Sequence, residues 1–140
     1  MPSTESTPLV DRALLAALPD RLRQPGFEAT GGMHATGLFS PDGELLVARE
    51  DVGRHNAMDK VIGRVLLDGD LPLHPRLLCV SGRLSFELVQ KAAMAGAPIL
   101  VGVGAPTSLA VSLAAELGLT LAGFARGDRV NVYAGAERVA

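Results

Sequence analysis

Two short apolar runs, each followed by a glycine-containing turn and a helical pattern, constrain the fold of this chain more than any other feature. The runs are residues 77–80 and 99–103, and the helical patterns that follow them are residues 85–95 and 108–117. A third apolar run, residues 119–125, comes directly after the second helical pattern. Strands that alternate with helices are typical of domains with parallel strands and helices on both faces of the sheet. We therefore predict a three-layer α/β/α sandwich with a mixed, mainly parallel sheet.

The rest of the chain supplies further strands and a covering helix. Residues 11–23 have leucines at helical spacing, and Pro19 is a kink or an early break in that helix. The glycine pair at 31 and 32 marks a bend before a strand. Residues 35–49 read as a hairpin around the Ser-Pro-Asp-Gly turn at 40–43, and this hairpin adds an antiparallel edge to the sheet. Residues 130–133 form a last short strand.

Length and composition exclude several classes of protein. The 140 residues fit one domain, which we place at residues 11–140 after a disordered lead-in at residues 1–10, and a hydrophobic content of 48% suffices for a core. A net charge of −2 and 4% aromatic residues argue against nucleic acid as the main partner. The single cysteine, Cys79, cannot form an internal disulfide, and no stretch suits a membrane span or a secretory signal. We expect a soluble cytoplasmic protein.

The most polar stretch of the chain, EDVGRHNAMDK at residues 50–60, leads into a helix that ends near Leu67. If this helix starts near Asn56, its apolar side consists of Ala57, Met58, Val61, Ile62, Val65 and Leu66. Its polar side carries His55, Asp59, Lys60 and Arg64. Asn56 and Asp59 have the spacing of a capping pair, which explains both residues without a function. His55, at the start of the helix, is a candidate functional residue.

Three turns from a strand into a helix, at residues 51–56, 81–85 and 104–108, are expected at one edge of the sheet. Helix N-termini present free N–H groups and partial positive charge, so an anion such as a pyrophosphate is the natural ligand. Arg54, Arg83 and one of Arg126 or Arg129 can add guanidinium groups. The candidate binding residues at these turns are His55, Arg83, Thr107 and Ser108. The alternative is that Ser85 and Thr107 only cap their helices.

No conventional catalytic set or metal site follows from the residues. Cys79 lies inside a predicted strand, where a thiol is usually buried and inert. The histidines and the cysteine lack zinc-site spacing, and the Gly-x-Gly at 102–104 is too short for a dinucleotide fingerprint. His34 is either a ligand contact or a packed histidine that bonds to the backbone. We therefore assign no catalytic residue and no metal ligand.

Three long motifs show a family resemblance. They are TGGMHATGLFSPDGELLVAREDVGRHNAMDKVIG, SGRLSFELVQKAAMAGAPILVGVGAPTSLAV and GLTLAGFARGDRVNVYAG. The chain resembles the FdhD family of formate dehydrogenase accessory sulfur carriers from about Asp11 to Val139. This resemblance implies a cytidine-deaminase-like α/β/α fold.

The resemblance also implies a function. Members of the family are understood to pass sulfur from a cysteine desulfurase to the molybdenum bis(molybdopterin guanine dinucleotide) cofactor, which is then inserted into formate dehydrogenase. The guanine dinucleotide, or GDP as a mimic, would lie over the helix N-termini. The family's cofactor-contacting segment corresponds here to Phe124, Ala125, Arg126, Gly127, Asp128 and Arg129. Arg126 and Arg129 would face phosphate, or else be solvated charges of a turn.

One departure from the family concerns sulfur. Members carry a Cys-x-x-Cys loop upstream of the first matched helix, this chain begins too late to contain it, and Cys79 is not at that position. A thiolate carries the sulfur, so we expect this chain to bind the cofactor without transferring sulfur. Zinc-dependent deamination is excluded if the helix starts at His55 and Ser85 align with those of the deaminases, because the general acid and the metal thiolates are missing.

Two further hypotheses remain open. The first is a small nucleotide hydrolase or transferase that uses His55 and Asp59 as an acid/base pair on one helix face. The second is an interaction module without catalysis, which docks on the desulfurase or the dehydrogenase and forms a homodimer through its apolar faces.

Overall fold

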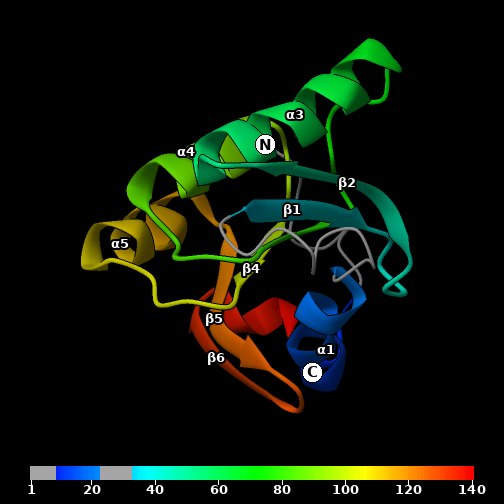
Figure 1. Cartoon of the computed structure of the whole chain (residues 1–140). Helices are drawn as coiled ribbons and strands as arrows, with labels where there is room; N and C mark the ends of the chain where they lie inside the picture. The colour runs from blue at the N-terminus through cyan, green and yellow to red at the C-terminus, as the bar shows by residue number, and fades with distance from the viewer. Residues whose placement is uncertain (1–8, 23–32) are drawn as a thin grey trace.

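A six-stranded sheet forms the centre of the molecule (Figure 1). The structure is a computed structural model and describes residues 9–22 and 33–140. The strand order is β2-β1-β3-β4-β5-β6. The strands are β1 (His34–Phe39), β2 (Leu45–Asp51), β3 (Leu77–Val80), β4 (Ile99–Gly102), β5 (Thr120–Arg126) and β6 (Arg129–Ala134).

The sheet is mixed, as predicted, but its parallel part is smaller than expected. Strands β3, β4 and β5 run parallel to one another. The other pairings, β1 with β2, β1 with β3, and β5 with β6, are antiparallel. Both flanks of the sheet are added as hairpins, and the strands of a hairpin run antiparallel. The predicted mixed sheet and the antiparallel edge from the first hairpin are confirmed, with two of the five strand pairings parallel.

Helices cover both faces of this sheet. Helices α3 (Arg54–Leu67), α4 (Phe86–Met94) and α5 (Ser108–Leu117) lie together on one face. Helix α1 (Arg12–Leu22) lies on the other face beside the short 3-10 helix η2 (Ala136–Arg138). This arrangement confirms the three-layer sandwich. Within the described residues, the structure has no helix long and apolar enough to cross a membrane.

The core has two halves, because successive residues of a strand face opposite sides of the sheet. In β3, Leu78 and Val80 pack under α3, α4 and α5, whereas Leu77 and Cys79 pack toward α1. All four residues of this strand are buried. A strand that is buried on both faces needs an unbroken apolar run, which explains the sequence pattern at residues 77–80.

The helix boundaries test the sequence patterns. Helix α5 has the predicted bounds, and α1 continues through Pro19, which is buried in the helix without breaking it. The expected apolar side of α3 was wrong at one residue, because Leu66 is 61% exposed.

Helix α3 begins two residues earlier than predicted. Its N-cap is Gly53, which provides no side-chain cap. The Asn56 amide instead donates to Asp51 at 3.4 Å, and Asp59 forms an ion pair with Lys91 at 2.8 Å. The predicted capping pair of Asn56 and Asp59 is therefore wrong, because both side chains lie beyond the true helix start.

The two ends of the described chain meet. Val10 forms a parallel bridge with Val139. The Val10 N–H donates to the Arg138 carbonyl, and the Val10 carbonyl accepts from the Ala140 N–H, both at 2.9 Å. Val10 is 2% exposed, so the last residue of the predicted lead-in packs into the core. Residues 1–8 and the glycine pair at 31 and 32 lie outside the described residues.

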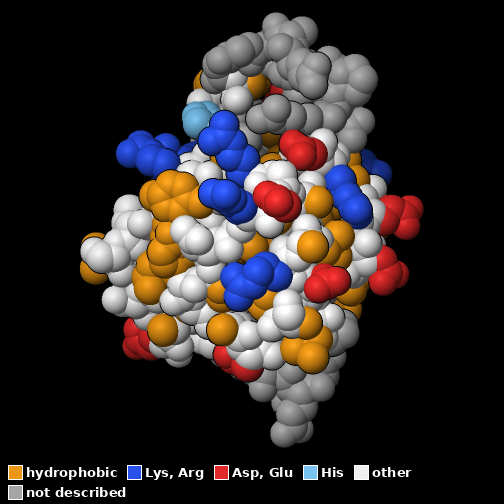
Figure 2. Space-filling model, turned by 90° about the horizontal axis from the view of Figure 1, so that it is seen from below, with side chains coloured by type: hydrophobic (Ala, Val, Ile, Leu, Met, Phe, Trp, Pro, Cys, Tyr) orange, Lys and Arg blue, Asp and Glu red, His pale blue; other side chains and the backbone are white. Residues whose placement is uncertain are grey.

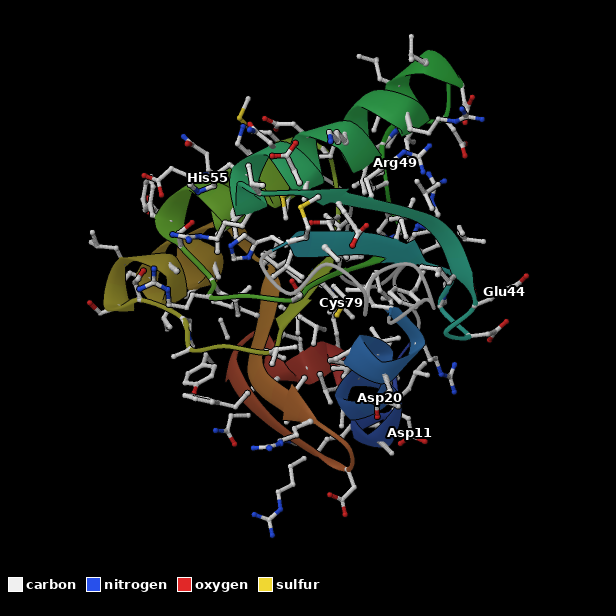
Figure 3. The ribbon with its side chains drawn as sticks, in the orientation of Figure 1. Asp11, Asp20, Glu44, Arg49, His55 and Cys79 are labelled. Atoms are coloured by element: carbon white, nitrogen blue, oxygen red, sulfur yellow. The ribbon has the colours of Figure 1, made fainter. Side chains whose placement is uncertain are left out.

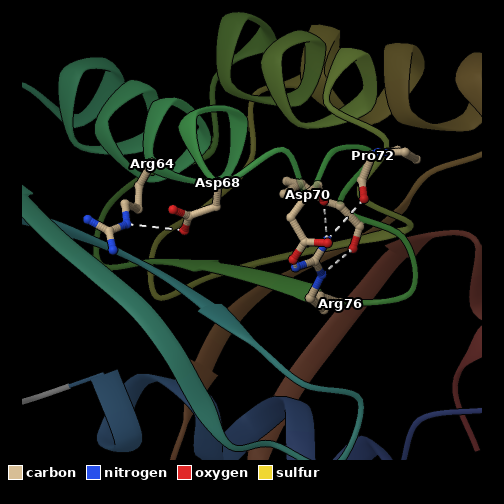
Figure 4. A network of polar contacts seen from close by, with 6 residues as sticks. Arg64, Asp68, Asp70, Pro72 and Arg76 are labelled. Atoms are coloured by element: carbon tan, nitrogen blue, oxygen red, sulfur yellow. Dashed lines mark hydrogen bonds and ion pairs between the residues drawn. The ribbon is translucent and has the colours of Figure 1, made fainter.

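The loop between α3 and β3 is held by arginine contacts (Figure 4). Arg76 pairs with the Asp70 carboxylate at 2.7 Å and donates to the carbonyls of Asp70, Pro72 and Leu73. Arg64 pairs with Asp68 at 3.2 Å near the end of α3. Both arginines therefore have partners within the protein, and both lie near the C-terminal end of α3.

Candidate anion-binding site

Four strands end at the same edge of the sheet. Strands β3, β4 and β5 are parallel, and β2 shares their direction because β1 runs antiparallel to both β2 and β3. The segments that follow these strands are residues 51–56, 81–85, 103–108 and 124–129, which together we call the rim. The prediction that the strand-to-helix turns gather at one edge is confirmed, and the β5–β6 hairpin joins them.

Backbone hydrogen bonds tie three of the rim segments together. The Gly104 N–H donates to the Gly82 carbonyl at 3.0 Å, and the Phe124 N–H donates to the Gly104 carbonyl at 3.1 Å. A Cβ on Gly104 would lie 3.0 Å from both the N and the Cα of Arg83. The two turns approach so closely that a Cβ at residue 104 would force the Arg83 backbone to shift.

Side chains cap two of the three helices that start at the rim. The Ser85 hydroxyl accepts from the Leu88 N–H at 3.3 Å, and the Thr107 hydroxyl accepts from the Ala110 N–H at 3.1 Å. The capping roles predicted for both residues are confirmed. Ser108, the first residue of α5, is exposed beside Thr107.

Asp51 organises the start of α3 in place of a side-chain cap. Its carboxylate accepts from the Gly53 N–H at 3.0 Å and pairs with Lys60 at 2.9 Å. The backbone hydrogen bond first, and then Lys60, lower the pKa of Asp51 from 3.8 to about 2. Since the folded state holds the ionised form, the resulting stabilisation is complete above about pH 4 and is lost as the pH falls toward 2.

Both histidines of the rim region lie against the segment at residues 81–85. His55 Nε2 lies 3.2 Å from the Ser85 hydroxyl oxygen, and Figure 3 shows His55 at the start of α3. The His34 ring packs on Gly82, where an added Cβ would lie 3.3 Å from Nδ1. Because Asp59 pairs with Lys91 instead, the contacts do not favour an acid/base pair of His55 and Asp59.

Four arginines at the rim differ from the other cations of the described chain. Their guanidinium groups make no hydrogen bond or ion pair with any described residue; the four are Arg54, Arg83, Arg126 and Arg129. In Arg54, Nε is buried and has no partner among the described residues. The remaining described cations each contact a carboxylate or a backbone carbonyl: Arg12, Arg21, Arg49, Lys60, Arg64, Arg76, Lys91 and Arg138. On the face shown in Figure 2, basic side chains lie mainly to the left and centre and most acidic ones to the right or along the lower edge.

A pocket of about 390 Å³ opens at the β5 end of the rim. It is lined by Pro19, Asp20, Val103, Phe124, Ala125, Arg126 and Arg129. Phe124 is 49% exposed and has a φ of +53°, a conformation that side chains rarely adopt. A strained residue that keeps an aromatic ring half exposed beside a pocket suggests a functional constraint.

The predicted binding residues therefore fall into two groups. Phe124, Ala125, Arg126 and Arg129 line the pocket, with Gly127 and Asp128 at the tip of the same hairpin. The other predicted residues, His55, Arg83, Thr107 and Ser108, lie along the rim but do not line this pocket. Pro19 and Asp20 were missed, because nothing in the local pattern of α1 indicates that this helix passes the end of β5.

Cys79 lies outside both the rim and the pocket. It is in the middle of the sheet, fully buried, and faces α1 (Figure 3). Burial raises the pKa of its thiol well above the ordinary value, so the thiolate does not form at neutral pH. The prediction that this cysteine is buried is confirmed.

Comparisons with known proteins agree with one another. The model of the FdhD/NarQ family matches residues 2–140. The chain is 62% identical to the sulfur carrier protein FdhD of Streptomyces coelicolor over 99% of this chain and 50% of the relative, and 52% identical to that of Saccharolobus solfataricus over 93% and 51%. It spans about half the length of these curated relatives.

A solved structure shows the same fold. The crystal structure of a protein described as a formate dehydrogenase accessory protein, from Desulfotalea psychrophila, superposes with a TM-score of 0.83 at 34% sequence identity. The match covers 95% of this chain and 62% of that one. From the family model and the relatives together, the chain belongs to the FdhD/NarQ family.

Proposed function

We propose that this chain binds the guanine dinucleotide part of the molybdenum bis(molybdopterin guanine dinucleotide) cofactor and presents that cofactor as cargo during its sulfuration. The relatives are named sulfur carriers, and the solved relative is described as a formate dehydrogenase accessory protein. For the whole protein we accordingly propose formate dehydrogenase as the receiving partner and a cysteine desulfurase as the sulfur donor, in the cytoplasm.

The observation that carries this proposal is the set of four rim arginines whose guanidinium groups have no partner among the residues that the structure describes. A guanidinium group can bind phosphate oxygens through two parallel hydrogen bonds, and it keeps its charge at any physiological pH. Arg126 and Arg129 line the pocket, while Arg54 and Arg83 lie along the rim beside the starts of α3 and α4. The same edge presents helix N-termini, whose partial positive charge adds to the attraction for an anion.

The pocket also suits the rest of a nucleotide. Phe124 offers a half-exposed ring at the pocket wall, and a planar base can stack on such a ring. A volume of about 390 Å³ lies within the usual range of small-molecule sites. The residues therefore fit a phosphorylated ligand with an aromatic base.

The role that we assign to this chain is binding and orientation of the cargo, with no sulfur step on its own residues. Cys79 is the single cysteine of the sequence and is buried in the sheet. Attack on a sulfur atom requires an accessible thiolate, which Cys79 does not provide.

Calorimetry with GDP tests the proposal. We expect saturable binding of GDP, no measurable binding of guanosine, and an affinity about 10-fold lower in Arg126→Ala or in Arg129→Ala, because each loses a charge-assisted hydrogen bond. Arg64→Ala is the matched control, since Arg64 is an exposed arginine paired with Asp68 away from the rim. Absence of GDP binding, or an equal loss in Arg64→Ala, would contradict the proposal.

A further inference from the structure

The contact between His55 and Ser85 joins two helices that start at the rim. His55 is the second residue of α3, and Ser85 is the N-cap of α4. His55 Nε2 and the Ser85 hydroxyl oxygen are 3.2 Å apart, and Ser85 is 9% exposed. A buried hydroxyl group needs partners for its oxygen and for its proton.

The available partners determine which atom donates. The Ser85 oxygen already accepts from the Leu88 N–H at 3.3 Å. Within the part of the chain that the structure describes, His55 Nε2 is the only acceptor available to the Ser85 hydroxyl proton. Ser85 therefore donates to Nε2, and a neutral imidazole that accepts at Nε2 carries its proton on Nδ1.

We propose that Ser85 is a positioning residue, which fixes neutral His55 in the Nδ1–H tautomer so that this N–H donates to an anionic oxygen of the ligand at the rim. Among the described residues, Nδ1 has no hydrogen-bond partner of its own, and the His55 ring is partly exposed. Arg54, the neighbouring residue, has no guanidinium partner within the described residues, so both groups suit an acceptor such as a phosphoryl oxygen. The identity of the ligand in this inference rests on the proposed function. The assignment of the His55 tautomer does not depend on that function.

Long-range 1H–15N correlation spectra of the ligand-free chain test the tautomer, at a pH where the ring is neutral. The His55 signals are identified by their loss in His55→Gln. We expect the Nδ1–H form in the wild type, although free neutral histidine prefers Nε2–H. Ser85→Ala should return His55 to the Nε2–H form, and Ser85→Thr should keep Nδ1–H because it retains the hydroxyl.

Thr107→Ala is the matched control for helix capping. It removes the equivalent cap of α5 without touching His55, so the His55 tautomer should not change.

Ser85→Asp provides an independent variant if Ser85→Ala does not fold, because a carboxylate can still cap α4 but can only accept from His55. It should therefore place a proton on Nε2. An Nε2–H ring in the wild type, or an unchanged tautomer in Ser85→Ala and Ser85→Asp, would overturn the assignment.

Titration with GDP separates this inference from the proposed function. We expect GDP to shift the His55 Nδ1 resonance, and Ser85→Ala to bind GDP about fivefold more weakly, the loss of one ordinary hydrogen bond, with recovery in Ser85→Thr. GDP binding that leaves Nδ1 unaffected would refute the donor role of His55. Failure of GDP to bind, with the Nδ1–H form present, would refute the proposed function while the positioning role of Ser85 stands.

Discussion

At the scale of single residues, the described cations form two groups: those that make hydrogen bonds or ion pairs with other described residues, and those that make none. Arg76 and Lys91 are paired with carboxylates, and Arg138 is buried with hydrogen bonds to Gly118 and Thr120. The exposed rim arginines, Arg126 among them, have no such contacts within the described residues. Exposed residues without contacts contribute little to folding, so their replacement should change stability by no more than about 0.5 kcal/mol. Loss of ligand binding in such a variant therefore reports on the site rather than on the fold.

Cys79 gives a prediction at the same scale. The thiol is fully buried and its pKa is raised, so alkylating reagents should reach it only when the chain opens. We expect iodoacetamide at pH 8 to label Cys79 at least about a hundredfold more slowly in native buffer than in denaturant. Mass spectrometry of timed samples measures both rates. Similar rates in the two conditions would show that the thiol is accessible and would reopen a sulfur-carrying role.

Single residues also show where the sequence was informative. Cys79 could be predicted as buried, because it lies within an apolar run that only a strand covered on both faces explains. Asn56 and Asp59 could not be placed, because a three-residue spacing that matches a capping pair also occurs inside a helix, as it does here after the start at Arg54. The partner of Asn56 is Asp51 at the end of β2, and the partner of Asp59 is Lys91 on α4, which only tertiary packing brings near. The contact of His55 with Ser85 likewise joins residues 30 positions apart, for which the sequence pattern gives no signal.

At the scale of elements, the site depends on how closely two strand-to-helix turns approach each other. The turn after β4 packs against the turn after β3 at Gly104, and its neighbours link Leu84 to Ala105 and Thr107 by backbone hydrogen bonds. The turn sequences predicted helix starts at these places, but they did not indicate that the turns bond to each other. This contact fixes the spacing of the α4 and α5 N-termini.

Two glycine substitutions test this contact. Gly104→Ala should lower the free energy of unfolding by about 1–3 kcal/mol, because its Cβ would meet the Arg83 backbone at 3.0 Å. Gly63→Ala is the matched control, since Gly63 lies within α3 with no atom within 4 Å of an added Cβ. That variant should raise the free energy of unfolding by about 0.5–1 kcal/mol through better helix propensity. Urea unfolding measures both, and equal effects of the two variants would show that the turns are not in close contact.

At the scale of the whole molecule, the topology explains why the proposed binding site lies at this edge. Because β2, β3, β4 and β5 share one direction, the segments that follow them converge, and the polar residues of four distant stretches become neighbours. Alternation of strands and helices was sufficient to predict that three of these segments converge, but not that the β5–β6 hairpin joins them. The alternation was not sufficient to place α1 at the pocket. Pro19 and Asp20 belong to α1, which lies on the face of the sheet opposite to α3, α4 and α5.

The most direct test of the central claim is to map the position of GDP on the chain by backbone amide NMR. We predict that GDP shifts the amide resonances of rim residues, above all residues 81–85, 103–108 and 124–129, which include Arg83, Arg126 and Arg129. The loop at residues 68–76 should be unaffected, because its arginine is already paired with Asp70. Shifts confined to that loop or to the outer surface of α3, or no shifts at saturating GDP, would contradict the assignment of the rim as the nucleotide site.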